Sequence, residues 1–132
     1  MSEKERDYAQ AENRAELLKL PPTLIFIDEA EVFCPKVGVR TRYAHRSAEA
    51  CEEIAKRGTK LGMGLVVATQ RIVNLSIDVR DNCNSIMAFR VIGRSNRTTL
   101  GQMSLFTAGA LERIKGLLKG ECILLGLITG GG

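Results

Sequence analysis

No phosphate-binding loop of the form G-x-x-x-x-G-K-[ST] occurs in these 132 residues, so the chain carries no Walker A motif. Tryptophan is absent and aromatic residues make up 5% of the chain, which argues against a platform on which single-stranded bases stack. No apolar run approaches the roughly 18 residues of a membrane span. The charged, polar N-terminus is also unlike a signal peptide. We therefore expect a cytoplasmic protein with no membrane partner.

Metal-binding and disulfide patterns are equally sparse. The four cysteines are Cys34, Cys51, Cys83 and Cys122, and His45 is the one histidine; their spacings match no zinc motif. We expect reduced, mostly buried thiols, although a disulfide remains open. The net charge of +4 is compatible with nucleic-acid contact but is too common to indicate it.

Short apolar segments alternate with amphipathic ones along the chain, which is the pattern of a parallel α/β sheet with helices on both faces. The chain is long enough for one domain, with an N-terminal helix over 1–20, a core over 21–128 and a glycine tail over 129–132. Within the core the pattern predicts strands at about 23–28, 64–69, 85–91 and 121–127, and helices at about 44–60, 97–106 and 108–117, with a short helical turn near 77–82.

The run Leu24–Ala30 is the most informative segment. Four apolar residues end abruptly in the adjacent carboxylates Asp28 and Glu29. Ligands bind at the carboxyl ends of the strands in open α/β sheets, and two carboxylates there are costly unless a cation or a reacting water uses them. This is the Walker B arrangement, in which Asp28 would hold Mg²⁺ through water and Glu29 would prepare a water for attack.

The second predicted strand also ends in polar residues, Thr69, Gln70 and Arg71. Neighbouring parallel strands end at the same edge of a sheet, so Gln70 is expected to face Glu29 across a space for a water and a γ-phosphate. An amide orients such a water without adding charge, and a cation compensates the charge that develops on the phosphate. Arg71 is the stronger candidate for that cation; Arg57, near the end of the preceding helix, is the weaker one.

Two stretches resemble the HerA/FtsK superfamily of hexameric DNA-pumping ATPases. The segment 24–35, LIFIDEAEVFCP, is similar to the family's Walker B segment, and 54–71, IAKRGTKLGMGLVVATQR, is similar to its helix–turn–strand that ends in T-Q-R. The resemblance extends over about 23–128, including a closing G-E strand at Gly120-Glu121. Thr59 stands where the family often has a basic residue considered for the arginine-finger role.

The resemblance implies the C-terminal part of a RecA-like ATPase core, with ATP and Mg²⁺ as cofactors, Thr69 and Gln70 beside the nucleotide, DNA as cargo and a hexameric ring. The phosphate-loop strand of that fold lies in the middle of the sheet, and this chain lacks it. Unpaired backbone groups in a buried region are unfavourable. The third strand would therefore close onto the second, or another chain bearing a Walker A loop, or a copy of this one, would complete the sheet.

Three functions follow from these observations. The first is half of a DNA-translocating ATPase that is inactive or weakly active alone. The second is a non-catalytic interaction or regulatory module derived from such an ATPase. The third is an unrelated small α/β protein such as a flavodoxin-like receiver, which also uses paired acids but needs a further acid and a late lysine that are not evident here.

Overall fold

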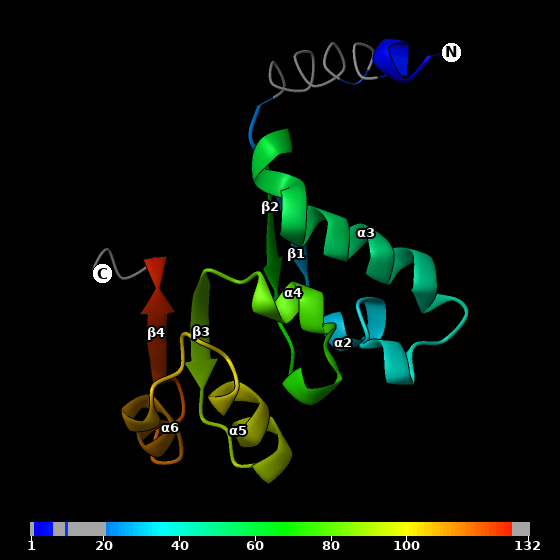
Figure 1. The fold of residues 1–132 in the computed structure, drawn as a ribbon. Helices are drawn as coiled ribbons and strands as arrows, with labels where there is room; N and C mark the ends of the chain where they lie inside the picture. The colour runs from blue at the N-terminus through cyan, green and yellow to red at the C-terminus, as the bar shows by residue number, and fades with distance from the viewer. Residues whose placement is uncertain (1, 7–9, 11–20, 128–132) are drawn as a thin grey trace.

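The computed structural model describes residues 2–6, 10 and 21–127, and its strands form two separate pairs (Figure 1). Strand β1 (Thr23–Ile27) lies parallel to β2 (Met63–Val67). Strand β3 (Ser85–Phe89) lies antiparallel to β4 (Cys122–Gly126). The predicted tail 129–132 and most of the predicted helix 1–20 lie outside the described residues.

Helix α3 (Ala44–Arg57) makes the crossover from β1 to β2. Its buried residues are Ala44, Ala48 and Cys51, whose spacings of four and three place them on one face of a helix. The 3-10 turn η2 (Gly58–Leu61) follows and ends at Gly62, which has a φ of 66°. Glycine tolerates this left-handed conformation, so Gly62 is suited to end the turn that leads into β2.

The remaining elements are short. Helix α2 (Ala30–Phe33) and the 3-10 turns η1 (Val37–Val39) and η3 (Ile72–Asn74) lie between the predicted helices and strands. Helix α4 (Ile77–Asp81) matches the predicted turn, and α6 (Ala108–Ile114) the last predicted helix. Helix α5 (Arg94–Gly101) begins three residues before the predicted start at 97. No helix in the described part of the chain is long and apolar enough to cross a bilayer.

The antiparallel β3–β4 pair corrects the expectation of a purely parallel sheet. Two helices, α5 and α6, separate these strands, and the chain then turns at Gly120, whose φ is 88°. The chain therefore enters β4 at the end where it left β3, and Phe89 lies opposite Cys122. A sequence pattern of alternating helices and strands does not distinguish this return from a parallel crossover.

Each strand pair packs against its own helices. Ile27, Leu65 and Val67 lie against a cluster of buried residues from α2, α3 and α4, which comprises Ala30, Cys34, Cys51, Leu75 and Val79. Ile86, Ile123 and Leu125 lie against a second cluster, which comprises Ala88, Leu100, Met103, Phe106, Ala110 and Ile114. The molecule therefore has two small cores, one for each strand pair.

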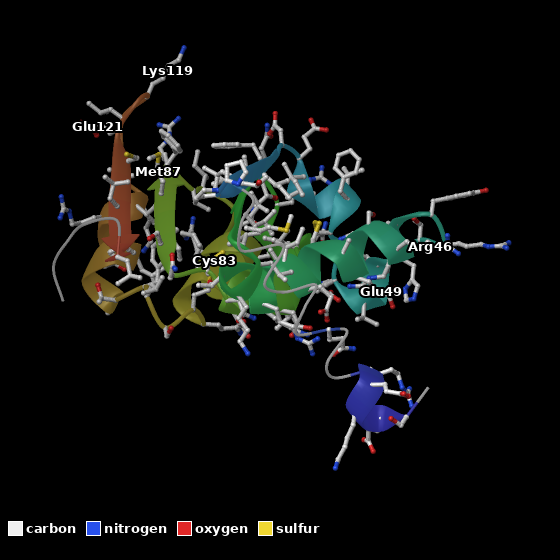
Figure 2. The ribbon with its side chains drawn as sticks, turned by 90° about the horizontal axis from the view of Figure 1, so that it is seen from above. Arg46, Glu49, Cys83, Met87, Lys119 and Glu121 are labelled. Carbon is white, nitrogen blue, oxygen red and sulfur yellow. A yellow bond between two sulfur atoms is a disulfide. The ribbon has the colours of Figure 1, made fainter. Side chains whose placement is uncertain are left out.

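The alternate side chains of the strands point away from these cores. Leu24 and Phe26 of β1 and Met87 and Phe89 of β3 are all more than half exposed. In Figure 2 Met87 points away from α5 and α6. The sequence predicts helices on this face of the sheets as well, but in the described residues it presents uncovered apolar side chains. We call these four residues the open apolar face.

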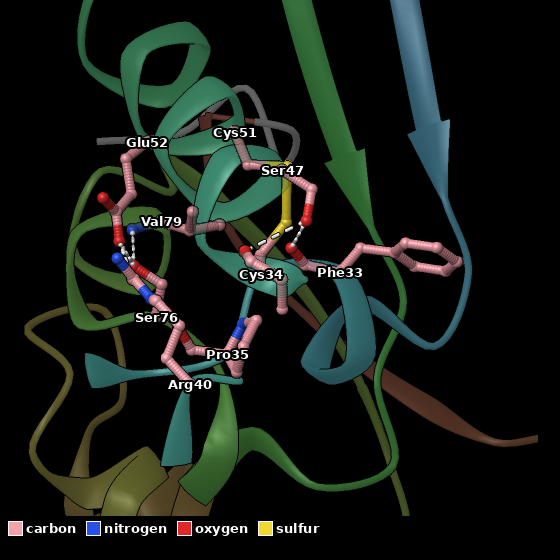
Figure 3. Close-up of a disulfide and its surroundings, with 10 residues drawn as sticks. Phe33, Cys34, Pro35, Arg40, Ser47, Cys51, Glu52, Ser76 and Val79 are labelled. Carbon is pink, nitrogen blue, oxygen red and sulfur yellow. Dashed lines mark hydrogen bonds and ion pairs between the residues drawn. A yellow bond between two sulfur atoms is a disulfide. The ribbon is translucent and has the colours of Figure 1, made fainter. Parts of the chain in front are cut away.

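A disulfide joins Cys34 to Cys51 and thereby links the end of α2 to the middle of α3 (Figure 3). The sequence predicted reduced thiols, and for these two cysteines that expectation is wrong. Cys34 is fully buried and Cys51 is 5% exposed, with Cα atoms 6.4 Å apart, a normal separation for a disulfide. Their 17-residue sequence separation gave no signal, because only the fold brings them together.

Next to the disulfide lies a polar network that Figure 3 also shows. Arg40 Nη2 donates to Glu52 Oε1 at 2.5 Å and to the Pro35 carbonyl oxygen at 3.0 Å. The same Glu52 oxygen accepts a hydrogen bond from Ser76 Oγ at 2.7 Å. The Arg40 and Glu52 side chains are only 9% and 15% exposed. The network thus fastens the 35–40 loop and the start of α4 to α3.

Candidate functional site

The ends of β1 and β2 lie side by side. Ile27 is opposite Val67 in the parallel register. Ala68 N donates to the Ile27 carbonyl oxygen at 2.9 Å, and Ala30 N donates to the Ala68 carbonyl oxygen at 2.9 Å. Consequently Asp28 and Glu29 leave the sheet at the same edge as Thr69 and Gln70, as the sequence predicted. We call this edge the strand-end rim.

Asp28 and Glu29 are both exposed on this rim. Glu29 has φ 49° and ψ 47°, and it is the one non-glycine residue with a positive φ in the described part of the chain. Its N–H donates to Asp28 Oδ1 at 2.8 Å. A left-handed non-glycine residue is strained, and such residues cluster at functional sites. The backbone therefore singles out the same glutamate as the sequence did.

Thr69 connects the two strand ends through its side chain. Its hydroxyl donates to Glu31 Oε2 at 2.5 Å and accepts from the Arg71 N–H at 3.1 Å. Glu31 lies on α2, so this bond joins the segment after β1 to the segment after β2. The sequence pattern did not single out Glu31, although its place two residues after Glu29 was a signal.

Gln70 and Arg71 are exposed beside Thr69. The turn that carries them is held by Asn96 of α5: the side-chain Nδ2 donates to the Gln70 carbonyl oxygen at 3.2 Å, and Oδ1 accepts from the Val73 N–H at 3.3 Å. Nothing in the sequence pattern indicated Asn96, which lies 26 residues beyond Gln70. The structure thus places Gln70 and Arg71 on the rim and adds a second residue that holds them.

Arg57 does not join this site within one chain. It is the last residue of α3, directly before the turn that leads into the start of β2, and so it lies at the opposite edge of the sheet from Glu29. Its guanidinium pairs with Glu53 at 3.2 Å on the same helix. The prediction that Arg57 contributes to the same site as Asp28 and Glu29 is therefore corrected, because a crossover helix returns to the opposite edge of the sheet.

No protein-family model matches the chain, but individual relatives do. The sequence is 28% identical over 106 residues to the DNA double-strand break repair helicase HerA of Pyrococcus furiosus. It is 29% identical over 106 residues to the probable helicase MJECL08 of Methanocaldococcus jannaschii. Both matches cover 80% of this chain.

The fold matches solved structures of the genome-packaging NTPase B204 from Sulfolobus turreted icosahedral virus 2. The complex with ATP-gammaS superposes with a TM-score of 0.67 over 98% of this chain at 18% identity, and the complex with AMP with a TM-score of 0.66. The chain resembles part of a HerA/FtsK-like ATPase. The predicted fold class, a P-loop NTPase-like α/β fold, is confirmed.

The chain spans 18% of the length of the Pyrococcus HerA and 59% of the length of the packaging NTPase. Solved structures of the packaging NTPase are complexes with ATP-gammaS, AMP or AMPPCP, so this structural neighbour binds nucleotides.

The rim has the chemistry that a Mg²⁺–nucleotide complex needs from this part of the fold. Mg²⁺ is usually held by one or two carboxylates together with water and phosphate oxygens, and Asp28 is an exposed carboxylate at the end of a strand. Within the described ranges no group of three or more His, Cys, Asp or Glu residues forms a closed metal cage. The residues present therefore fit a metal held jointly with a nucleotide rather than a structural metal site.

Two hollows in the described structure are lined mainly by residues outside the predicted nucleotide contacts. One, of about 470 Å³, lies beside β1 and α3 and is lined mainly by apolar side chains such as Phe26, Phe33 and Ile54. The other, of about 240 Å³, lies near Arg80, Cys83 and Met103, away from the rim. The first hollow reaches the strand-end rim at Asp28, whereas the second includes none of the predicted nucleotide contacts.

Proposed function

We propose that this chain is the C-terminal half of the ATPase core of a HerA-like DNA-translocating ATPase. It supplies the hydrolytic side of an ATP site, while the phosphate-binding loop comes from a segment outside these 132 residues. Asp28 would hold Mg²⁺ through water, Glu29 would act as the general base, Gln70 would orient the attacking water, and Arg71 would face the phosphate.

The observation that carries the proposal is the convergence of the two strand ends. The Ile27–Val67 register and the hydrogen bonds around Ala68 bring Glu29 and Gln70 to one rim, although they are 41 residues apart in the sequence. A carboxylate and an uncharged amide at neighbouring strand ends are the pair that positions water for phosphoryl transfer. The similarity of the sequence to the helicase HerA supports the same function.

In the proposed reaction the Glu29 carboxylate accepts a proton from the water that attacks the γ-phosphorus, while the bond from that phosphorus to the β–γ bridging oxygen breaks and ADP leaves. The Gln70 side-chain amide fixes the orientation of that water. The positive charge of the Arg71 guanidinium stabilises the negative charge that develops on the phosphate oxygens. Bound Mg²⁺ would supply further charge compensation at the phosphates.

The separation of the two strand pairs supports completion by another segment. Strands β2 and β3 belong to different strand pairs in the described structure, and in Figure 1 β3 lies between β4 and β2. Unpaired strand edges accept a further strand. This arrangement argues against direct closure of β3 onto β2, and a phosphate-loop strand would fit between them.

The handedness of crossovers supports the same completion. Parallel crossovers are right-handed, and α3 covers the Ile27 face of β1 and β2. A strand–helix–strand unit that begins between β2 and β3 and ends beside the outer edge of β1 crosses the sheet in the opposite direction. Its crossover helix would therefore lie on the opposite face of the sheet. That face is the open apolar face, where Phe26 is 71% and Met87 54% exposed.

DNA would be the cargo, and a ring of such subunits the assembly. Because Arg57 lies at the opposite end of the β1–β2 pair from the rim, it would serve only the site of a neighbouring subunit.

The test compares the chain alone with a chimera in which a G-x-x-x-x-G-K-[ST] segment of a HerA-like ATPase precedes residue 21. The 132-residue chain should hydrolyse ATP negligibly, because the phosphate loop supplies most of the grip on the nucleotide. The chimera should hydrolyse ATP, and Glu29→Gln should reduce its turnover by roughly 100-fold or more while nucleotide binding stays unchanged.

Glu112→Gln is the matched control, since Glu112 is an exposed glutamate on α6 paired with Lys115. It should leave turnover intact. Strong hydrolysis by the chain alone, or an active Glu29→Gln chimera, would overturn the proposal. A folded, nucleotide-binding chimera that never hydrolyses ATP would instead favour a non-catalytic interaction module.

A further inference from the structure

We propose that Asn96 is a positioning residue for Gln70, and that through it α5 sets the place of the water-orienting amide. This inference rests on the proposed function for the role of Gln70, but its structural part stands on hydrogen bonds alone. Asn96 lies in the third position of α5, outside every segment that the sequence pattern links to chemistry.

Asn96 holds both ends of the turn that follows β2. Its Nδ2 donates to the Gln70 carbonyl oxygen at 3.2 Å, and its Oδ1 accepts from the Val73 N–H at 3.3 Å. One side chain therefore fixes the first and last residues of the Gln70–Val73 turn. The carbonyl that it binds belongs to Gln70 itself, so the hydrogen bond restrains the backbone from which that side chain projects.

This pair of bonds needs an amide. Asparagine presents one donor group and one acceptor group on the same planar end, which matches one carbonyl and one N–H of the turn. Aspartate keeps the acceptor for Val73 but places a second oxygen against the Gln70 carbonyl. Alanine removes both partners. A comparison of asparagine, aspartate and alanine at position 96 therefore separates the hydrogen bond to the Gln70 carbonyl oxygen from the hydrogen bond with the Val73 N–H.

The Asn96 bonds also join the two parts of the molecule. Helix α5 packs on the core of β3 and β4 through Leu100, and Ile72 from the turn packs on that same core. On the other side, Thr69 is tied to Glu31 of α2 at 2.5 Å. The segment that carries Gln70 is thus held from one side by the β1–β2 unit and from the other by the β3–β4 unit.

The consequence is a defined route of coupling. A displacement of α5 relative to β2 alters the Gln70 backbone through Asn96, while Glu31 keeps Thr69 in place. Any partner that moves β3 and α5 against β1 and β2 therefore changes the orientation of Gln70 first.

The structural test uses the 132-residue chain and NMR of the turn. In Asn96→Ala the Val73 amide should exchange with solvent roughly two- to tenfold faster, the range for loss of one hydrogen bond. In Asn96→Asp that amide should keep its wild-type exchange rate, while the Gln70 carbonyl resonance shifts and the Gln70 side-chain amide loses order. Ser95→Ala, at an exposed neighbouring position on α5, should change none of these signals.

The functional test uses the ATP-hydrolysing chimera described above. Asn96→Asp should lower kcat about tenfold or more while the KM for ATP and the melting temperature stay near wild type, because misplacing a reacting group costs rate rather than binding. If Asn96→Asp lowered the melting temperature together with kcat, Asn96 would have a structural role only, and the proposal would be overturned.

The failures are distinguishable. An inactive wild-type chimera overturns the proposed function, and the NMR measurements on the chain still decide whether Asn96 holds the turn. An Asn96→Ala chain whose Val73 exchange and Gln70 signals equal those of Ser95→Ala overturns the positioning role even if the wild-type chimera hydrolyses ATP.

Discussion

The two strand pairs of this molecule are stabilised in different ways. The β3–β4 unit is held mainly by its apolar cluster, in which Ile114 is fully buried and Leu100 is 3% exposed. The β1–β2 unit also has an apolar cluster, but polar and covalent ties run through it: the Arg40–Glu52 ion pair and the disulfide. The candidate catalytic residues that the structure brings together all lie on the β1–β2 unit.

The difference shows what a site requires beyond a core. Apolar packing is non-directional and tolerates small shifts of one element against another. Hydrogen bonds and ion pairs have preferred distances and angles, so they fix the loops that leave a strand. The β1–β2 unit uses such ties around the rim, whereas the β3–β4 unit contributes to the rim, among the contacts of the described residues named above, through Asn96 alone.

The largest expected effect breaks the apolar side of this comparison. Ile114→Ala should lower the free energy of unfolding by about 3–4 kcal/mol, because it removes a fully buried side chain and leaves a cavity. Urea denaturation followed by circular dichroism measures this. Leu118→Ala, at a residue that is 66% exposed, is the control and should change stability by less than about 0.5 kcal/mol. Equal effects from the two variants would show that the core of the β3–β4 unit is not packed around Ile114 as described.

The next effect breaks the polar side. Glu52→Ala should lower the free energy of unfolding by about 2–4 kcal/mol, because it leaves the Arg40 guanidinium and the Ser76 hydroxyl without their shared acceptor in a mostly buried place. Glu53→Ala, one residue along the same helix, removes only the exposed pair with Arg57 and should cost about 0.5 kcal/mol or less. Thermal unfolding at two salt concentrations would separate the buried pair from the screened one.

A smaller effect of opposite sign concerns the rim itself. Glu29→Gly should raise the free energy of unfolding by about 0.5–1 kcal/mol, since glycine adopts a positive φ without the steric cost that glutamate bears. Glu29→Gln keeps that backbone strain and should leave stability unchanged. Chemical denaturation of the two variants side by side tests this. A destabilised Glu29→Gly chain would mean that the left-handed conformation is not strained.

The smallest effect concerns Cys83. Burial, with a lesser contribution from the Asp81 charge, raises the pKa of the Cys83 thiol above its ordinary value of 9.0. The folded chain therefore keeps a proton that the unfolded chain releases, so stability falls as the pH rises above about 9. Cys83→Ser should flatten that alkaline slope.

The thiols themselves offer a direct reading of the same shift. Iodoacetamide, which reacts with the thiolate, should label the exposed Cys122 before Cys83 at a pH of about 8, as mass spectrometry would show. Faster labelling of Cys83 would contradict the raised pKa.

The sequence predicted the parts of this fold that depend on local pattern. Strand β1 was placed to within a residue because its apolar run stops abruptly at Asp28. The start of α3 was placed correctly because its small buried residues recur at helical spacing, although the helix ends at Arg57, before the predicted end at 60. The rim followed from one general rule, that neighbouring parallel strands end at the same edge of a sheet, and this rule alone predicts that Glu29 and Gln70 meet.

The parts that depend on tertiary contact were not accessible. Asn96 and Glu31 matter only because folding brings them to the turn after β2, and the Cys34–Cys51 bridge depends on how α2 meets α3. The direction of β4 depends on how α5 and α6 return the chain. Arg57 was considered because it lies near the end of the helix before β2, but that helix end lies at the start of β2, opposite the rim.

The bridge between Cys34 and Cys51 makes the redox state of the surroundings a determinant of how this protein behaves. In the chain-entropy description, closing a loop of this length restricts the denatured chain and raises the free energy of unfolding by about 3 kcal/mol. This is a sizeable share of the net stability of a small domain. A sample purified in air and one purified in dithiothreitol are therefore two thermodynamically distinct materials with one sequence, and the anchoring of α2 beneath the paired acids differs between them.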